Sequence, residues 1–218
     1  MKYMAKISIL TVFVCLLSVT GYTRESVGMA SGNLTTADAC GFGLGYTGLI
    51  FGYGDAASCI GGYVTYGFSN FTEGRIKIGF SDLDGPGTDP EFLFGFDLKY
   101  KFMDYSGEMN NNPLDLALTS IVEYVNYPGS SVLELGGGLI GSIPYHFTSG
   151  RSLIPYTRLN LRWERYSENP GMNIAESNYR VGLNMGVKYE LSSDINLYGE
   201  VQIDGNEAIF TGLEILSF

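Results

Sequence analysis

The chain has 218 residues, of which 17% are charged and 14% are aromatic, and its formal net charge is −10. This acidic balance argues against nucleic acid as a partner, and 30 glycines without a three-residue period exclude a collagen-like chain. The aromatic content argues against disorder, and the length predicts a single domain.

The first residues have the organisation of an export signal. Lys2 and Lys6 precede an apolar run over residues 7–19, and small residues follow it. The run is shorter than the roughly 20 residues that a membrane-spanning helix needs. We therefore expect a signal peptide over residues 1–21, with cleavage after Gly21 or as late as Ala30, and a short N-terminal segment over residues 22–39.

Ten segments with strand character follow, and each ends in a turn sequence rich in Gly, Pro, Asn, Asp or Ser. They cover residues 40–51, 59–68, 73–81, 91–103, 115–126, 132–142, 153–166, 178–191, 194–203 and 207–218. Most are longer than the ~5–6 residues of an average soluble strand and match the ~9–11 of a tilted membrane strand. No stretch after the signal approaches ~18 consecutive apolar residues, so a membrane-inserted chain would cross as strands.

Apolar and polar residues alternate along most of these segments. In residues 91–103, Phe, Leu and Tyr occupy the even positions, and Asp97, Lys99 and Lys101 are among the odd ones. A Lys or Arg facing lipid at the bilayer midplane costs about 2–4 kcal/mol, so the polar row is expected to face inward. This predicts an all-β fold over residues 40–218: a single antiparallel up-and-down transmembrane β-barrel of ten strands, or eight if one hairpin near residues 40–51 is misread. A soluble β-sandwich is the alternative, but the strands are long for one and a water-facing surface would need more Lys and Glu.

Charged residues of both signs are predicted to line the lumen. They are Arg75, Lys77, Asp97, Lys99, Lys101, Asp115, Glu123, Glu134, Arg158, Arg162, Glu164, Arg180, Lys188, Glu190 and Glu200. A ten-stranded barrel has a narrow interior, and buried charges are expected to pair. The network is interpreted either as a salt-bridged plug or as the lining of a small pore.

The signal, the Gly-aromatic texture of "GFGLGYTGLIFGYG", the "YELSSDINLYGEV" hairpin and the terminal Phe together resemble small bacterial outer-membrane β-barrels. That resemblance implies an outer-membrane location, contact with membrane lipid and lipopolysaccharide, recognition by the barrel-assembly machinery, and a monomer. It also implies that Phe210, Leu216 and Phe218 form the assembly signal. Glu214 departs from the family pattern because it shares the parity of Phe218, so a β-bulge near Ile215 is expected.

Few residues suggest chemistry. Enzymes among such barrels use a histidine as general base, and His146 is the only one in this chain. Its place on the predicted periplasmic side argues against an enzyme. Asp82, Asp84 and Asp89 could contact a divalent cation weakly, but their spacing does not fit an EF-hand and favours a solvated acidic loop. No resident metal or cofactor is expected.

Cys40 and Cys59 would enter an oxidising compartment after export. A hairpin centred on Gly54 does not place them opposite each other, so a disulfide would require a different turn, near residues 49–50.

The leading functional prediction is a non-enzymatic surface or structural barrel with a largely plugged lumen. A narrow channel for small polar solutes or ions is the first alternative. A lipid- or peptide-modifying enzyme that uses His146 or the acidic loops is the second.

Overall fold

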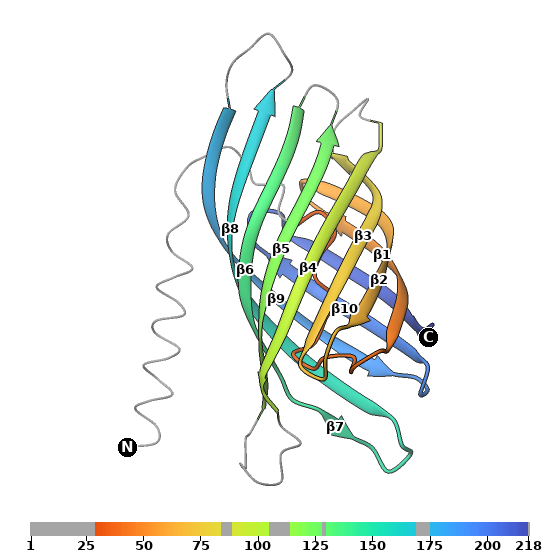
Figure 1. Ribbon diagram of the computed structural model, residues 1–218. Helices are drawn as coiled ribbons and strands as arrows, with labels where there is room; N and C mark the ends of the chain where they lie inside the picture. Colours follow the sequence, from red (N-terminus) through yellow and green to blue (C-terminus); the bar gives the residue numbers. More distant parts are fainter. Residues whose placement is uncertain (1–28, 84–88, 105–113, 128–129, 169–174, 218) are drawn as a thin grey trace.

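The computed structural model describes residues 29–83, 89–104, 114–127, 130–168 and 175–217 (Figure 1). The expected signal peptide therefore lies outside the described residues. None of the described residues belongs to a helix long and apolar enough to cross a membrane.

The described residues form strands with irregular connections. The strands are β1 (Gly45–Gly54), β2 (Ala57–Gly67), β3 (Thr72–Leu83), β4 (Glu91–Met103), β5 (Asp115–Tyr127), β6 (Ser130–Ser142), β7 (Tyr145–His146), β8 (Ser152–Glu168), β9 (Ala175–Glu190), β10 (Ile195–Ile203) and β11 (Ala208–Leu216). Each of the ten long strands pairs antiparallel with its neighbours, and the two-residue β7 pairs with the start of β8.

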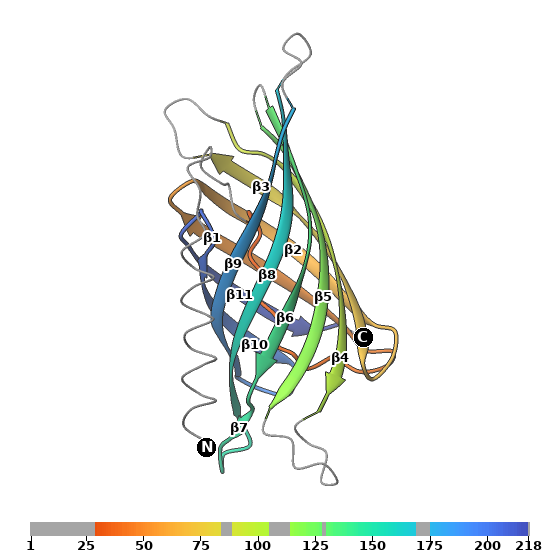
Figure 2. The same ribbon diagram turned by 90° about the vertical axis from the view of Figure 1, so that its left-hand side faces the viewer.

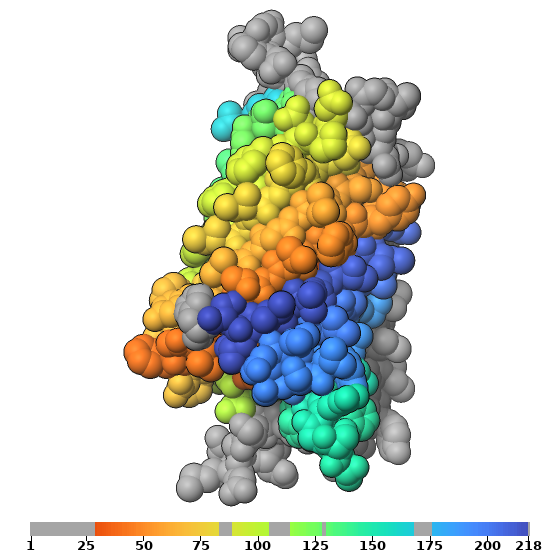
Figure 3. Space-filling model, turned by 90° about the vertical axis from the view of Figure 1, so that its right-hand side faces the viewer, coloured from red at the N-terminus to blue at the C-terminus, as the bar shows by residue number. Residues whose placement is uncertain are grey.

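The sheet closes on itself. β6 pairs with β8, and β1 pairs with β11 from Tyr46 opposite Leu216 to Gly54 opposite Ala208. Figure 3 shows the first and last strands of the chain side by side, β1 in orange against β11 in dark blue. The predicted single up-and-down antiparallel barrel is confirmed, with ten long strands among the described residues rather than eight.

The barrel is apolar outside and polar inside. The outward row of β4, from Phe92 to Phe102, is 37–53% exposed, whereas Asp97, Lys99 and Lys101 between them are 4–8% exposed. The same alternation runs along β5, where buried and exposed residues follow each other from Asp115 to Tyr127. A soluble sandwich would bury the aromatic row instead, so this arrangement excludes it.

Two local expectations are wrong. The first barrel strand starts at Gly45 rather than at residue 40. Gly41 and Gly43 have φ values of +95° and +76°, so the chain turns there before the strand that pairs with β2 begins. The expected bulge near Ile215 is absent from the described part of β11, which pairs without interruption with both neighbours. The pairing of β4 with β5 shifts instead between Lys101 and Met103.

Candidate functional site

Residues 29–40, which precede the barrel, lie inside it and are called the luminal segment below. Met29, Leu34 and Ala37 are 0% exposed, and the red-orange trace of the segment runs within the ring of strands (Figures 1 and 2). The segment starts near the far rim, where β1 ends, and descends to the terminal rim, where β1 begins and β11 ends. Its end nearer the far rim is marked by a hydrogen bond from Gln202 Nε2 to the Met29 carbonyl (3.3 Å).

Cationic side chains of β3 and β4 bind the backbone carbonyls of the segment. Arg75 Nη1 donates to the carbonyls of Asn33 (2.8 Å) and Leu34 (3.2 Å). Lys99 Nζ donates to the Thr36 carbonyl at 2.8 Å and also to the carbonyl of Asp38. Because the positive end of each side chain meets a carbonyl oxygen, this side of the wall is complementary to a peptide backbone.

Carboxylates of the wall bind the backbone N–H groups. Glu200 accepts hydrogen bonds from the N–H groups of Asn33 and Leu34, both at 2.9 Å. Glu123 accepts from the N–H of Ser31 at 3.3 Å and from its hydroxyl. Two consecutive N–H groups aimed at one carboxylate form a small anion-binding concavity.

A third carboxylate, Glu73, accepts from the N–H of Cys40 at 2.8 Å. Glu73 also forms an ion pair with Lys99 at 2.8 Å. Glu73 thus holds the end of the segment at the terminal rim. Its ion-pair partner Lys99 binds the segment again, at the Thr36 carbonyl.

Two residues of the segment also fit the wall by shape. Gly32 has a φ of +60°, and a Cβ there would lie 2.6 Å from the ring of Phe210. Leu34 packs over Gly212, where a Cβ would lie 2.8 Å from the Leu34 Cδ1 atom. Leu34 and Phe210 belong to one buried apolar cluster, so the segment is held by packing as well as by hydrogen bonds.

The residues of the predicted lumen network lie along this interior. Twelve of the fifteen are at most 8% exposed, while Arg180, Lys188 and Glu190 are partly exposed. Lys77 is within 3.2 Å of Asp97 and 3.6 Å of Glu123. Charges on β3, β4, β5 and β10 therefore meet one another or the luminal segment. Asp115 is also buried, close to the terminal rim.

A second cluster lies on the other side of the lumen, around Arg162. Its guanidinium pairs with Glu164 at 2.7 Å, with Glu134 at 3.5 Å, and with Asp204. Arg180 joins through Glu164 at 3.7 Å. Asp204 follows β10 directly and was missed by the sequence reasoning, because it reads as part of the "DGN" turn.

Arg158 differs from the other luminal cations. It is 0% exposed, and its Nε and Nη2 atoms have no hydrogen-bond partner among the described residues. Its Nη1 lies 3.8 Å from the sulfur of Met29. The start of the luminal segment therefore lies against an incompletely satisfied guanidinium.

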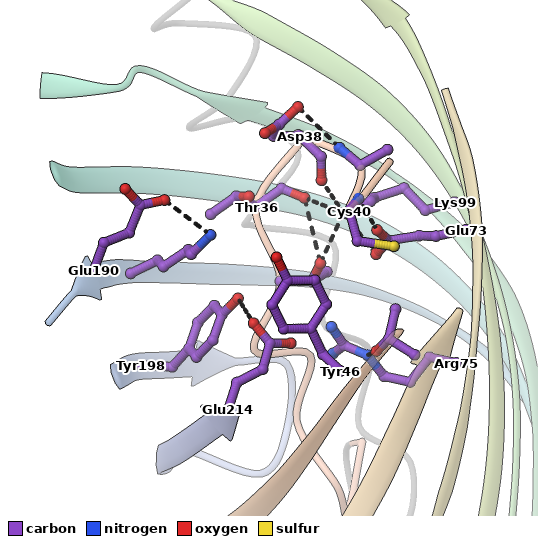
Figure 4. Close-up of a pocket in the computed structure, with 14 residues that line it drawn as sticks. Thr36, Asp38, Cys40, Tyr46, Glu73, Arg75, Lys99, Glu190, Tyr198 and Glu214 are labelled. Carbon is purple, nitrogen blue, oxygen red and sulfur yellow. Dashed lines mark hydrogen bonds and ion pairs between the residues drawn. The ribbon is translucent and has the colours of Figure 1, made fainter. Parts of the chain in front are cut away.

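A polar cavity of about 140 Å³ lies at the terminal rim between the luminal segment and the strands (Figure 4). Its lining includes the cations Arg75, Lys99 and Lys188 and the anions Glu73 and Glu190. Lys188 and Glu190 pair at 3.2 Å. The cavity is the kind of small, charged space that water or a small polar solute fills.

Cys40 and Cys59 are both free thiols. Cys40 lies at the terminal rim, whereas Cys59 pairs with Gly52 near the far rim. The disulfide that the sequence left open is therefore not formed. Burial, together with the nearby charge of Glu73, raises the pKa of the Cys40 thiol to about 12.

His146 lies in β7 beyond the barrel wall and is exposed. Its Nδ1 is 2.9 Å from Ser152 Oγ. A hydrolytic triad needs a carboxylate on the other ring nitrogen, and among the described residues no carboxylate forms a hydrogen bond or ion pair with this imidazole.

The other predicted site residues are dispersed. Asp82 is half-buried, Asp89 is exposed, and Asp84 lies outside the described residues; the described part of the chain contains no cluster of His, Cys, Asp or Glu able to hold a metal ion. Phe210 faces the lumen, where it is 1% exposed, and Leu216 ends β11. Phe218 lies outside the described residues.

The sequence reasoning missed the luminal segment itself. It placed residues 22–39 before the barrel and assigned them no role. The stretch "ASGNLTTADA" carries mostly small and polar side chains and one charge, and has neither strand nor helix periodicity. The available signal was a weak one: a short, nearly uncharged stretch directly before a barrel whose lumen is rich in charge.

No family model and no curated protein matches this sequence. Among solved structures, the chain is similar to the β domain of the Bordetella autotransporter BrkA, with 12% identity and a TM-score of 0.47 over 81% of this chain and all of that one. It is also similar to the COG4313 outer membrane channel from Pseudomonas putida F1 (7% identity, TM-score 0.43, 85% of this chain and 100% of that one). A third is the N-terminal β-barrel domain of Pseudomonas aeruginosa OprF (11% identity, TM-score 0.37, 81% and 99%). At these identities the likeness concerns the fold alone.

Proposed function

We propose that this chain is an integral outer-membrane β-barrel with a structural or surface-contact role, whose lumen is closed at rest by its own N-terminal segment. The observation that carries the proposal is the occupied lumen: the wall satisfies backbone groups of residues 29–40 from Met29 to Cys40. Ion pairs close the other side around Arg162. We infer that the described residues fill the polar interior and so close the path for solutes.

The membrane location is supported by the outward surface. Large apolar side chains such as Phe80, Phe94 and Ile209 are 39–59% exposed, and exposure of such a belt to water would be costly. We propose that this belt contacts outer-membrane lipid, including lipopolysaccharide, around a monomer that the barrel-assembly machinery inserts. Fractionation of cells, with comparison of heated and unheated samples on SDS gels, tests this location.

The closed state is tested by planar-bilayer recording of the purified full-length protein. We expect no discrete conductance steps, because the segment and the Arg162 cluster fill the lumen together. Frequent ion-selective steps in the unmodified protein would contradict a closed resting state.

A narrow channel is the second candidate, and the cavity at the terminal rim favours it. That cavity already brings cations and anions together at one opening of the barrel. In this version the segment moves aside and the cavity continues into a pore for small polar solutes. Solute uptake by reconstituted vesicles, compared with protein-free vesicles, distinguishes it from the structural role.

We propose no reaction at His146, because among the described residues no carboxylate is hydrogen bonded to its imidazole. Turnover of a lipid or peptide substrate that is lost in His146→Ala would contradict this.

A further inference from the structure

The wall of the lumen contacts the luminal segment mainly through its backbone. Carbonyls of Asn33, Leu34 and Thr36 accept from Arg75 and Lys99. The N–H groups of residues 33, 34 and 40 are bound by wall carboxylates. Such contacts use groups that every polypeptide carries, because each residue other than proline brings one N–H and one carbonyl.

Selectivity in this site comes from two positions of the segment. At position 32 only glycine fits under Phe210 with the observed φ of +60°. At position 34 a leucine side chain fills the space that Gly212 leaves open. Apart from Met29 at its start, the remaining residues of the segment are small or polar, so the wall imposes a short pattern rather than a full sequence.

A buried carboxylate of the wall, that of Glu200, receives half of its hydrogen bonds from the segment. Glu200 is 2% exposed, and besides the two N–H groups it accepts hydrogen bonds from Tyr156 (2.7 Å) and Asn184 (2.9 Å). Two of its four donors therefore come from the segment. A buried carboxylate that lost them would be left under-satisfied, which is costly.

We propose that the lumen is a binding site for a polypeptide without regular secondary structure, which residues 29–40 occupy within the same chain, and that it accepts a separate peptide of this sequence when the segment is absent. The ligand class is a stretch with small or hydroxylated side chains, a glycine, and a leucine two residues later. The terminal rim is the entrance, because the segment ends there beside the open cavity. This inference rests on the proposed closed barrel only in the conductance experiment. Uptake of a fluorescent peptide tests the binding site without it.

The first test uses a variant that lacks residues 29–39, reconstituted in a planar bilayer, with a synthetic peptide of residues 29–40 as the probe. Unheated SDS-gel mobility reports whether the barrel has assembled. We expect discrete conductance steps from the variant and their block by the peptide added at the terminal-rim side. A peptide with Leu34→Asp should block about tenfold to a hundredfold less well, because it loses the burial of a leucine.

A matched wall variant tests the site itself. Gly212→Val in the deletion background fills the space that Leu34 occupies and leaves the luminal charges unchanged. We expect the same conductance steps and loss of the peptide block. Equal block by the wild-type and Leu34→Asp peptides, or undiminished block of the Gly212→Val barrel, would overturn the proposal.

A second experiment tests the same site if the deletion variant fails to assemble into a barrel. A specific protease site is inserted between Phe42, which is 72% exposed, and Gly43, and the chain is cut after the barrel has formed. We expect a fluorescent peptide of residues 29–40 to replace the detached segment in cut protein and to be absent from uncut protein. Failure of the cut protein to take up the peptide would refute the binding site. Conductance by the uncut full-length protein would instead refute the closed resting state.

Discussion

The fit of Gly32 under Phe210 makes a quantitative prediction about how firmly the luminal segment is held. An alanine at position 32 would adopt a left-handed φ of +60°, which costs a non-glycine residue roughly 1–2 kcal/mol. Its Cβ would also lie 2.6–2.9 Å from ring atoms of Phe210, and overpacking of this kind costs typically about 1–3 kcal/mol. The free energy of local opening of the segment should therefore fall by about 2–5 kcal/mol.

Hydrogen exchange followed by mass spectrometry measures this opening directly, because hydrogen-bonded amides exchange only when the local structure opens. In Gly32→Ala, the amides of Asn33 and Leu34 should exchange roughly 30-fold to about 4000-fold faster than in the unmodified protein. Exchange in the barrel strands should stay unchanged, since their hydrogen bonds do not involve the segment.

Gly43 provides the matched control. Its φ is +76°, but a Cβ there would meet no atom within 4 Å. Gly43→Ala should therefore pay only the backbone cost of about 1–2 kcal/mol. Gly32→Ala should likewise cost only the backbone term of about 1–2 kcal/mol when Phe210 is also replaced by alanine, because the ring that the new Cβ would meet is then absent. Equal exchange in Gly32→Ala and Gly43→Ala, or no coupling to Phe210, would refute the view that packing under this ring holds the segment in the lumen.

Three further changes have distinct expected results. Lys99→Met should lower the free energy of unfolding in urea by about 3–5 kcal/mol, because it leaves the buried Glu73 carboxylate without the cation that it pairs with. Lys188→Met, at the partly exposed rim, should lower it by at most about 1 kcal/mol. Equal losses in the two variants would contradict the difference in burial. In a variant with Cys59 replaced by serine, the alkylation rate of Cys40 should rise about tenfold per pH unit up to pH ~10. The reason is that the raised pKa of about 12 keeps the Cys40 thiol neutral over this range. A plateau in the rate near pH 9, typical of an ordinary thiol, would show that Cys40 is not buried. Phe96→Arg places a charge on the outward face in the middle of β4 and should reduce stability in lipid vesicles by about 2–4 kcal/mol; an unchanged stability would argue against a lipid-facing belt.

The barrel could be predicted because one local rule governs most of it. In a strand, successive side chains alternate between two faces, and a charge on the lipid-facing side is penalised most strongly near the middle of the membrane. Lys99 and Phe96 could therefore be assigned to opposite faces from their parity alone. The turn sequences separated the strands well enough to give the right number.

Glu214 illustrates where the family pattern misled. Its parity places it with Phe210, and the expectation of an apolar outward row at the chain end suggested a bulge. The carboxylate instead faces the lumen, where it accepts hydrogen bonds from Tyr198 (2.9 Å) and Asn196 (3.0 Å). The regular parity was correct, and Phe210 faces inward along with it because the luminal segment gives its ring something to pack against.

The luminal segment could not be predicted by such a rule. Its partners are far away in the sequence: Asn33 binds Glu200 and Ser31 binds Glu123. Neither end of these contacts has a local signature, because a small polar residue and a strand carboxylate each have many possible partners. Only the closed barrel brings them together.

The charge pattern of the wall explains why a ten-stranded barrel carries an insert. About eight strands enclose an interior that side chains alone can fill, and a wider ring needs further material or water. On the Arg162 side, large side chains reach into space left by glycines: a Cβ at Gly138 would lie 2.7 Å from Arg158 Nε. On the side of β10, the hydrogen-bond donors to Glu200 among the described residues are all neutral, and two of them are N–H groups of the segment. Because Glu200 presents its carboxylate to two consecutive N–H groups of the luminal segment, the segment and the wall form one continuous polar core inside the barrel.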